Sequence, residues 1–300
     1  MTAPDPHAPA LPPWALAVAA MFSVQLGSAL SIPVIETVGP AGTAWLRLSF
    51  GAVILIAFAR PSLRDLRRRD LPALLGLGVV TGLMSVAFLA AIERIPLGAA
   101  IAIEFLGPLT VAALRSHSVR ALVWPTMALG EVVGLTEPWS GSINLAGVGF
   151  AGFAAVCWGT YILLTQRVGD RFDGITGLAL TIPVAALTAA VVGIPQSAGH
   201  LTPGILAAAL GLAFLLPVLP FAFEMLVLRR MTPTAFGTLM ALEPAIGVLL
   251  GLLVLHQRPS LIQSFGIVLV VLAGAGAQLG GRRRQSPYEL SDDPGLDLVR

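Results

Sequence analysis

The sequence contains no lysine, so all 18 of its basic side chains are arginines, and a lysine Schiff base or lysine ion relay is excluded. Its one cysteine, Cys157, cannot form an intramolecular disulfide and is expected to be a small core residue, since it lies in an apolar run. Charged residues make up only 11% of the 300 residues, whereas soluble domains carry roughly a quarter. The chain therefore has too little polar surface for a water-soluble protein.

What the sequence does contain is apolar residues, which account for 56% of the chain and give a mean hydropathy of +0.86. A membrane-spanning helix needs about 20 such residues. We predict an all-α integral membrane protein with ten transmembrane helices, at residues 14–33, 42–59, 71–91, 97–114, 121–136, 145–165, 174–193, 204–226, 234–255 and 263–280. The connections between these runs are short and rich in turn-forming residues, so no soluble domain is expected between them.

Arginine placement predicts the orientation of these spans, because cytoplasmic loops are enriched in basic residues. Arginines follow every even-numbered span, as in "RPSLRDLRRRD" after the second and "RRR" after the tenth. The odd-numbered exits offer only Arg94, beside Glu93, and Arg258. Both ends of the chain are therefore expected in the cytoplasm, with residues 1–13 and 282–300 as disordered tails. Residues 1–13 lack a basic region typical of a cleavable signal peptide, so the first span is expected to be an uncleaved anchor.

An internal repeat relates the two halves of the chain. "RIPLGAAIAIEFLGP", from Arg94, aligns with "RMTPTAFGTLMALEP", from Arg230, and the alignment places Pro108 on Pro244. The copies lead into spans four and nine, five spans apart, so they must face opposite sides of the membrane. Inverted repeats of this kind are typical of secondary transporters, whose substrate site lies near the midplane between the halves. We predict two five-helix units, residues 14–138 and 139–281, around a central cavity.

Four segments carry a resemblance to a known family: "ERIPLGAAIAIEFLGPL", "VCWGTYILLTQRVG", "LPFAFEM" and "FGTLMALEPAIGVLLGLLVLHQ". They resemble the EamA-type carriers of the drug/metabolite transporter superfamily, and are closest in motif to its threonine and homoserine exporters. The resemblance covers residues 14–280 and implies ten helices in two inverted repeats, location in the bacterial inner membrane and efflux driven by an ion gradient. Three positions depart from the family pattern: Gln257 replaces a usual glutamate, Ile32 replaces a frequent lysine, and Glu131 is additional.

Four glutamates fall inside the apolar runs, where a charge is costly. Each must face a cavity, find a partner or become protonated. Glu243 and Glu104, in the two repeat copies, are candidates for taking up a proton or binding a substrate ammonium group, and Glu224 is a third. The alternative for each is a neutral acid hydrogen-bonded to a neighbouring helix. Glu131 lies in "GEVVG", a spacing typical of close helix packing.

Four of the prolines within predicted spans are candidates for helix breaks or hinges. Inside a helix, a proline removes a backbone N–H and displaces the carbonyl four residues earlier. Pro108 would free the carbonyl of Glu104, and Pro244 that of Met240, so each break could contribute to a cation or ammonium site; a packing kink is the alternative. Pro217 and Pro220 are candidate hinge residues for alternating access. Small-residue pairs in "GVVTG" (78–82) and "GVLLG" (247–251) indicate helix packing.

Uncharged polar and aromatic side chains could also line the cavity. Trp158 and Tyr161 lie one turn apart in span six, and Gln25 belongs to a polar stripe in span one. Lipid-facing or packing roles are equally compatible with these positions. Arg47 could meet a substrate carboxylate, but its position near the start of span two favours a side chain that extends to the membrane interface.

The sequence thus predicts a secondary transporter that exports amino acids, such as threonine or homoserine, or related small metabolites, by alternating access coupled to protons. A carrier of drugs, purines or other metabolites with the same fold is the alternative. An intramembrane enzyme is a distant one, because no aspartate or histidine lies inside a span. The expected partners are the small-molecule substrate, protons and the lipid bilayer, and we expect no nucleic acid, metal or cofactor. The oligomeric state is left open.

Overall fold

The computed structural model describes residues 12–61, 67–115, 144–169, 171–172, 174–228 and 239–261, together with 265, 268, 271 and 272. The predicted span 121–136, with Glu131, lies outside these residues, as do most of span 263–280 and both tails. Regular structure in the described part is entirely helical. Its helices are α1 (Pro13–Leu30), α2 (Ile32–Ala59), α3 (Leu71–Ile92), α4 (Leu97–Glu104), α5 (Leu106–Arg115), α7 (Leu145–Gly169), α8 (Gly174–Ser197), α9 (Pro203–Ala213), the π-helix η4 (Phe214–Val218), α10 (Leu219–Leu228) and α12 (Glu243–Leu255).

At least six helical segments are long and apolar enough to cross a membrane. They are α1, α2, α3, the joined α4–α5 segment, α7 and α8. The α9–η4 segment and α12 are shorter apolar helices. These helices coincide with predicted spans, so the expectation of an all-helical membrane protein is confirmed in its coarse form.

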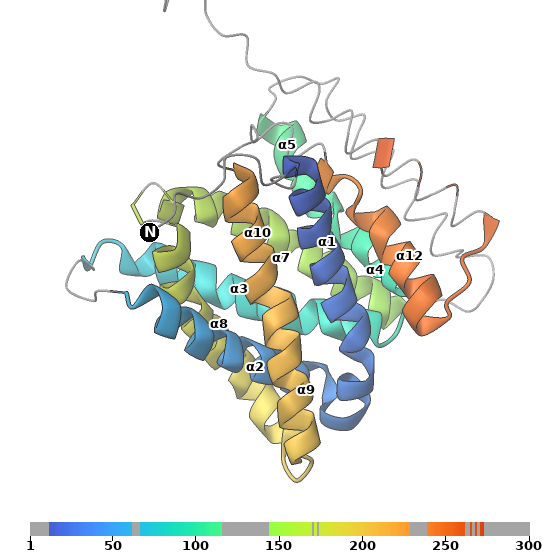
Figure 1. Ribbon diagram of the computed structural model, residues 1–300, viewed down its shortest axis with the longest axis horizontal. Helices are drawn as coiled ribbons and strands as arrows, with labels where there is room; N and C mark the ends of the chain where they lie inside the picture. Colours follow the sequence, from blue (N-terminus) through green and yellow to red (C-terminus); the bar gives the residue numbers. More distant parts are fainter. Residues whose placement is uncertain are drawn as a thin grey trace, which may run out of the picture.

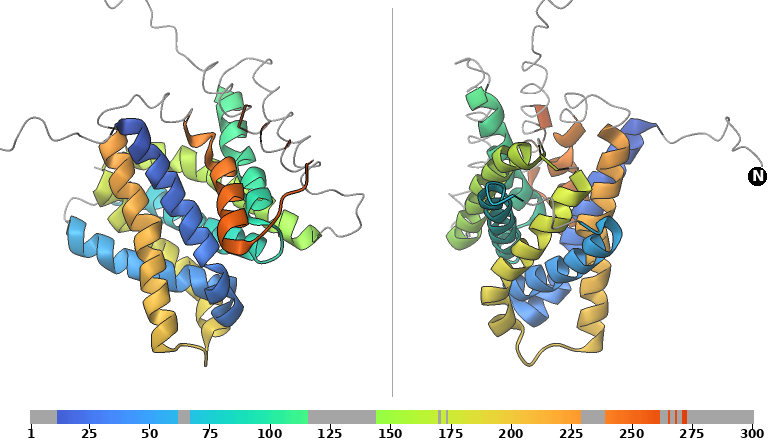
Figure 2. Two further views of the ribbon diagram at one scale, coloured as in Figure 1. Left: turned by 45° about the vertical axis from the view of Figure 1, so that its right-hand side comes forward. Right: turned by 90° about the vertical axis from the view of Figure 1, so that its left-hand side faces the viewer.

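The helices pack as one body in which segments far apart in sequence lie side by side (Figures 1 and 2). The α9–η4–α10 column runs beside α1, and α12 packs against both α1 and α4. Helices α2, α3 and α8 form a second layer, with α7 packed on α3, α4 and α5. One core cluster of buried alanine, leucine and isoleucine side chains joins α2, α3, α4, α7 and α8. Each half of the chain therefore contributes helices to the same core.

Small residues bring these helices into close contact, as the sequence predicted. A Cβ atom on Gly82 of α3 would lie 2.6 Å from the Ala185 carbonyl oxygen of α8. A Cβ atom on Gly247 of α12 would lie 2.1 Å from the Ile101 side chain of α4. The packing interpretation of "GVVTG" and "GVLLG" is confirmed.

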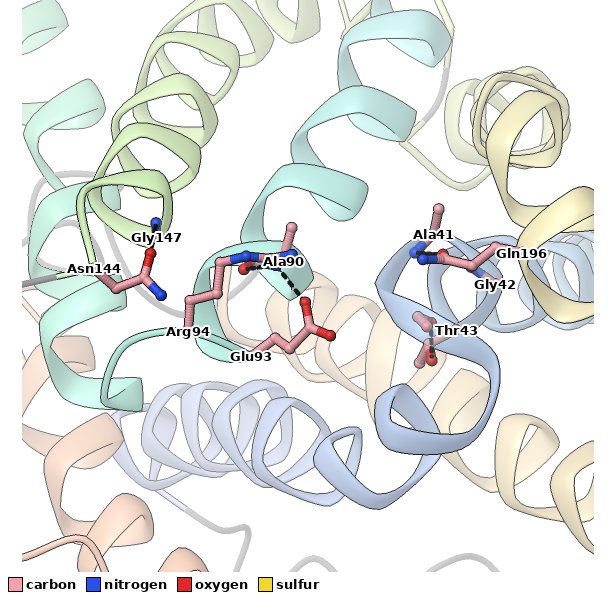
Figure 3. Close-up of polar contacts among 10 residues, drawn as sticks. Ala41, Gly42, Thr43, Ala90, Glu93, Arg94, Asn144, Gly147 and Gln196 are labelled. Carbon is pink, nitrogen blue, oxygen red and sulfur yellow. Dashed lines mark hydrogen bonds and ion pairs between the residues drawn. The ribbon is translucent and has the colours of Figure 1, made fainter.

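The start of α2 differs from the prediction. Residues 34–41 were expected to connect the first two spans, but α2 already begins at Ile32 and contains a kink at Gly39. Gly39 has φ 72° and ψ 168°, a conformation that is essentially restricted to glycine. The Gln196 Oε1 of α8 accepts hydrogen bonds from the backbone N–H groups of Ala41 (2.8 Å) and Gly42 (3.2 Å) beyond the kink (Figure 3). A glutamine from the second half thus caps the helix that restarts after Gly39.

A second glutamine caps α4 in the same manner. Gln257 follows α12, and its Oε1 accepts a hydrogen bond from the backbone N–H of Leu97, the first residue of α4 (3.0 Å). Its position is fixed because α12 ends at His256 in the left-handed conformation (φ 57°), and the Gln257 N–H donates to the Gly251 carbonyl (2.9 Å). The restart of α2 after Gly39 and the start of α4 therefore both obtain an acceptor from a glutamine in the second half.

Candidate functional site

Two helix breaks occupy equivalent positions in the repeat. Helix α4 ends at Glu104 and α5 begins at Leu106, so the first break falls at Phe105. In the second copy, the helix is interrupted at Ala241 and Leu242, and α12 begins at Glu243. The repeat alignment places Phe105 on Ala241, and in each copy a proline follows three residues later. The breaks thus fall within one turn of Pro108 and Pro244, whose rings disrupt the preceding helical turn.

The two breaks lie together in space. Ala102, Phe105 and Leu109 of the first copy form one buried cluster with Ala241 of the second, packed against Ala245 and Val248. Trp158 of α7 joins this cluster, and its ring meets that of Phe105 edge to face, with centroids 6.1 Å apart and planes at 65°. The structure therefore brings one predicted aromatic residue, Trp158, to the breaks.

The two acids of the repeat copies flank this cluster. Glu104 is partly buried at the end of α4, and Glu243 is 5% exposed in the first turn of α12. The two carboxyl groups are close enough to interact electrostatically. Glu243 also benefits from the N-terminal end of α12, where the helix dipole favours negative charge.

A packing constraint explains why the acids occupy different registers in the two copies. The residue equivalent to Glu243 is Gly107, and a Cβ atom there would lie 2.1 Å from the Ala155 carbonyl oxygen of α7. No side chain fits between α5 and α7 at that point. The first copy instead carries its acid one turn earlier, at Glu104.

Arg47 is the residue that sequence reasoning misplaced. It was expected to extend to the membrane interface, but it is only 3% exposed and lies near the middle of α2. Thr43 and Gly51, one turn on either side, are also buried, so this face of α2 points into the protein. Within the described part of the chain, the Arg47 Nε and Nη1 atoms have no hydrogen-bond partner. Arg47 attracts Glu104 electrostatically without forming an ion pair with it.

Gln25 is a second buried polar side chain that is not fully satisfied. On α1, Ser23 and Gly27 face η4: the Ser23 hydroxyl donates to the Leu215 carbonyl (2.9 Å), and Gly27 lies against the Leu215 side chain. Gln25 is rotated about 200° from both, on the opposite side of α1. It is 4% exposed, and its Oε1 atom has no partner among the described residues.

One of the predicted hinge prolines, Pro217, lies against α2 one turn from Arg47. Pro217 is in η4, where Leu216 leaves helical geometry (φ −158°, ψ 114°), and Pro220 is in the first turn of α10. A Cβ atom on Gly51 would lie 3.0 Å from the Pro217 ring, so the break in this column touches the α2 face that carries Arg47. Glu224 belongs to α10, and its side chain lies outside the described structure.

Tyr161 is not brought to the helix breaks. It packs in a different cluster, with Leu74 and Leu77 of α3 and Val168 of α7, although Trp158 is only one turn away. Thr165, one turn beyond Tyr161, has a buried hydroxyl without a hydrogen-bond partner in the described residues. Cys157 is buried, which confirms its expected place in the core.

In chemical terms, α2, α4 and α12 contribute a buried guanidinium group and two carboxyl groups that interact electrostatically. Helix α1 adds a buried amide, that of Gln25. Two of the guanidinium nitrogens and the amide oxygen retain hydrogen-bonding capacity. A small ligand with both an anionic and a cationic group matches this arrangement, because buried charges require partners of opposite sign.

Comparison with known proteins agrees with a transporter. Residues 145–276 match the EamA-like transporter family. The chain is 35% identical over 273 residues to the threonine/homoserine exporter RhtA of Salmonella typhimurium, covering 88% of this chain and 90% of that protein. It is 34% identical over 289 residues to RhtA of Escherichia coli strain K12, covering 93% and 95% respectively. One crystal structure shares the fold with a TM-score of 0.60 at 19% identity, covering 91% of this chain and 99% of that one. These relatives are transporters rather than enzymes, and the chain belongs to the EamA-like transporter family.

Proposed function

We propose that this protein exports a small zwitterionic amino acid of the threonine or homoserine type across the bacterial cytoplasmic membrane. The observation that carries the proposal is the buried Arg47 guanidinium, two of whose nitrogens have no hydrogen-bond partner among the described residues. It also lies within electrostatic range of Glu104. The substrate carboxylate binds Arg47, and its ammonium group binds Glu104 or Glu243. The names of the RhtA relatives support the substrate class.

Gln25 completes this site as a hydrogen-bond acceptor. Its buried Oε1 accepts from the substrate ammonium or side-chain hydroxyl group. A hydroxyl group is the feature that distinguishes threonine and homoserine from apolar amino acids of similar size. A site built to hydrogen-bond a hydroxyl group discriminates strongly against an analogue that lacks it.

Transport proceeds by alternating access, with the two inverted five-helix units (residues 14–138 and 139–281) rocking around the site. The matched breaks at Phe105 and Ala241, with both prolines nearby, support this arrangement. Proton coupling follows if substrate and proton compete for the same carboxyl group. Glu243 is the first candidate because it is buried and belongs to the second break. In this arrangement both chain ends lie in the cytoplasm, as the arginine placement predicts.

Flux measurements in proteoliposomes test the carboxylate contact. Arg47→Gln removes the positive charge that is proposed to bind the substrate carboxylate. Loss of a charge-assisted hydrogen bond costs about 1.5–3 kcal/mol, so threonine affinity should fall roughly 10–150-fold. Threonine amide, which has no carboxylate, should compete equally well in wild type and variant. Exposed Arg258 provides a matched control, since Arg258→Gln removes the same charge away from the site. Unchanged threonine affinity in folded Arg47→Gln would refute the proposed site.

A second variant tests proton coupling separately. Glu243→Gln should abolish threonine flux driven by a pH gradient while leaving substrate exchange at equal pH measurable. If pH-driven flux persists undiminished, Glu243 does not carry the proton. The substrate assignment would still stand on the result for Arg47.

A further inference from the structure

A pocket separate from the helix-break site lies between the beginning of α3 and the end of α7. Its volume is about 230 Å³, and three arginines line it: Arg69, Arg167 and Arg171. Within the described part of the chain, Asp70 is the acidic residue in its wall, and Val168 and Phe172 contribute apolar surface. The pocket thus combines positive charge with an apolar lining.

Asp70 organises the pocket without neutralising it. The Asp70 side chain is 8% exposed, and its Oδ1 atom lies 3.4 Å from the Arg171 Nη1 atom. Its Oδ2 atom accepts a hydrogen bond from the backbone N–H of Arg67 (3.3 Å), which fixes the turn before α3. Among the described residues that line the pocket, one carboxylate is set against three guanidinium groups, which leaves an excess of two positive charges. The pocket therefore favours an anion.

The surface next to the pocket carries exposed apolar side chains. On α3, the side chains of Leu71, Leu75, Val79 and Leu83 are 37%, 49%, 40% and 39% exposed. Their spacing of four residues places them along one face of the helix. This exposed apolar stripe begins one residue after Asp70 and runs along α3 away from the pocket. In a membrane helix, such a face contacts acyl chains.

We propose that this pocket binds the headgroup of an anionic phospholipid, with the acyl chains lying along the α3 stripe. Arg69 and Arg167 contact the phosphate, and Arg171 contributes while held by Asp70. A soluble phosphate compound would use the arginines alone, whereas a phospholipid also uses the adjoining apolar face. Basic pockets between membrane helices recognise anionic headgroups in this manner. The inference is independent of the proposed transport site.

Native mass spectrometry of the purified protein, with phosphatidylglycerol or phosphatidylcholine added, tests the assignment. Wild type should retain phosphatidylglycerol in preference to phosphatidylcholine. Arg167→Gln should weaken phosphatidylglycerol binding about fivefold, the effect expected for one arginine near a membrane surface. The control Arg258→Gln removes an equal charge from a residue that does not line the pocket, and should leave this binding unchanged.

Each remaining outcome would overturn the proposal. Equal retention of the two lipids would show that charge does not select the ligand. An equal loss in Arg167→Gln and Arg258→Gln would indicate general surface charge rather than this pocket. Glycerol phosphate competing as effectively as phosphatidylglycerol would indicate a soluble phosphate ligand. Size-exclusion profiles of all variants establish that any loss of lipid reflects the pocket and not unfolding.

Discussion

The hydrogen bond from Leu97 to Gln257 allows a prediction about a position where the family resemblance implied a glutamate. The Gln257 Oε1 caps the first residue of α4 at 3.0 Å, and a glutamate oxygen could accept the same bond. The cap requires a side-chain oxygen that can reach the Leu97 N–H, and both glutamine and glutamate have one. Glutamine and glutamate are therefore interchangeable at position 257 as far as the cap is concerned.

We predict that Gln257→Glu is more stable than the wild type and that Gln257→Met is less stable. Methionine has a similar size but no comparable acceptor, and loss of a helix cap costs about 0.5–2 kcal/mol. Glutamate keeps the bond and adds a negative charge at the N-terminus of α4, which contributes about 0.3–1 kcal/mol at low ionic strength. At about 2 °C per kcal/mol for a chain of this size, Gln257→Met should melt about 1–4 °C lower.

Thermal unfolding in detergent at two salt concentrations is the appropriate assay. The advantage of Gln257→Glu should vanish in 1 M salt, where the Debye length falls to about 3 Å. The deficit of Gln257→Met should persist, since it comes from a lost hydrogen bond. Hydrogen exchange should also show faster exchange at the Leu97 amide in Gln257→Met. A methionine variant as stable as wild type, with an equally protected Leu97, would contradict the assigned cap.

Three further substitutions test the backbone geometry through the same melting assay. Gly39→Ala should destabilise by at least about 2 kcal/mol, because φ is 72° and the new Cβ would lie 2.1 Å from Gln196 Cδ; a neutral effect would contradict this kink. His256→Gly should stabilise by about 0.5–1 kcal/mol by relieving left-handed strain at φ 57°, and a lower melting temperature would count against the α12 cap geometry. Gly107→Ala should cost about 1–3 kcal/mol by forcing α5 away from α7, whereas wild-type stability would mean that these helices are not in contact there.

Hydropathy and small-residue spacing were sufficient to predict most of the helices, because a membrane span is specified locally by its length and apolar composition. The predicted start of α2 was wrong because Gly39 and Pro40 are residues typical of a loop. In the structure they form a kink within the helix, and Gln196 of α8 caps the segment after it. That error carried over to Arg47. With α2 expected from residue 42, Arg47 appeared to be near a membrane surface; with α2 beginning at Ile32, it lies near the helix centre.

The site was predicted in part for similar reasons. Proline positions in the two repeat copies indicated helix breaks, and the structure interrupts both helices three residues before each proline. Periodicity alone could not separate Trp158 from Tyr161. Their different surroundings depend on α7 crossing from α4 and α5 to α3, which is a tertiary feature. Proline is favoured in the first turn of a helix, so Pro33 could have indicated that α2 begins near that residue. Arg47 would then have been expected well inside the helix.

The two glutamine caps also have a consequence for biosynthesis. Gln196 lies 155 residues after Ala41, and Gln257 lies 160 residues after Leu97. At 5–20 residues per second, the ribosome takes roughly ten to thirty seconds to make each intervening stretch. During that interval, the backbone N–H groups at both helix starts must rely on water or other temporary partners. The hydrogen bonds that cap these two helix starts can therefore form only after Gln196 and Gln257 have been synthesised.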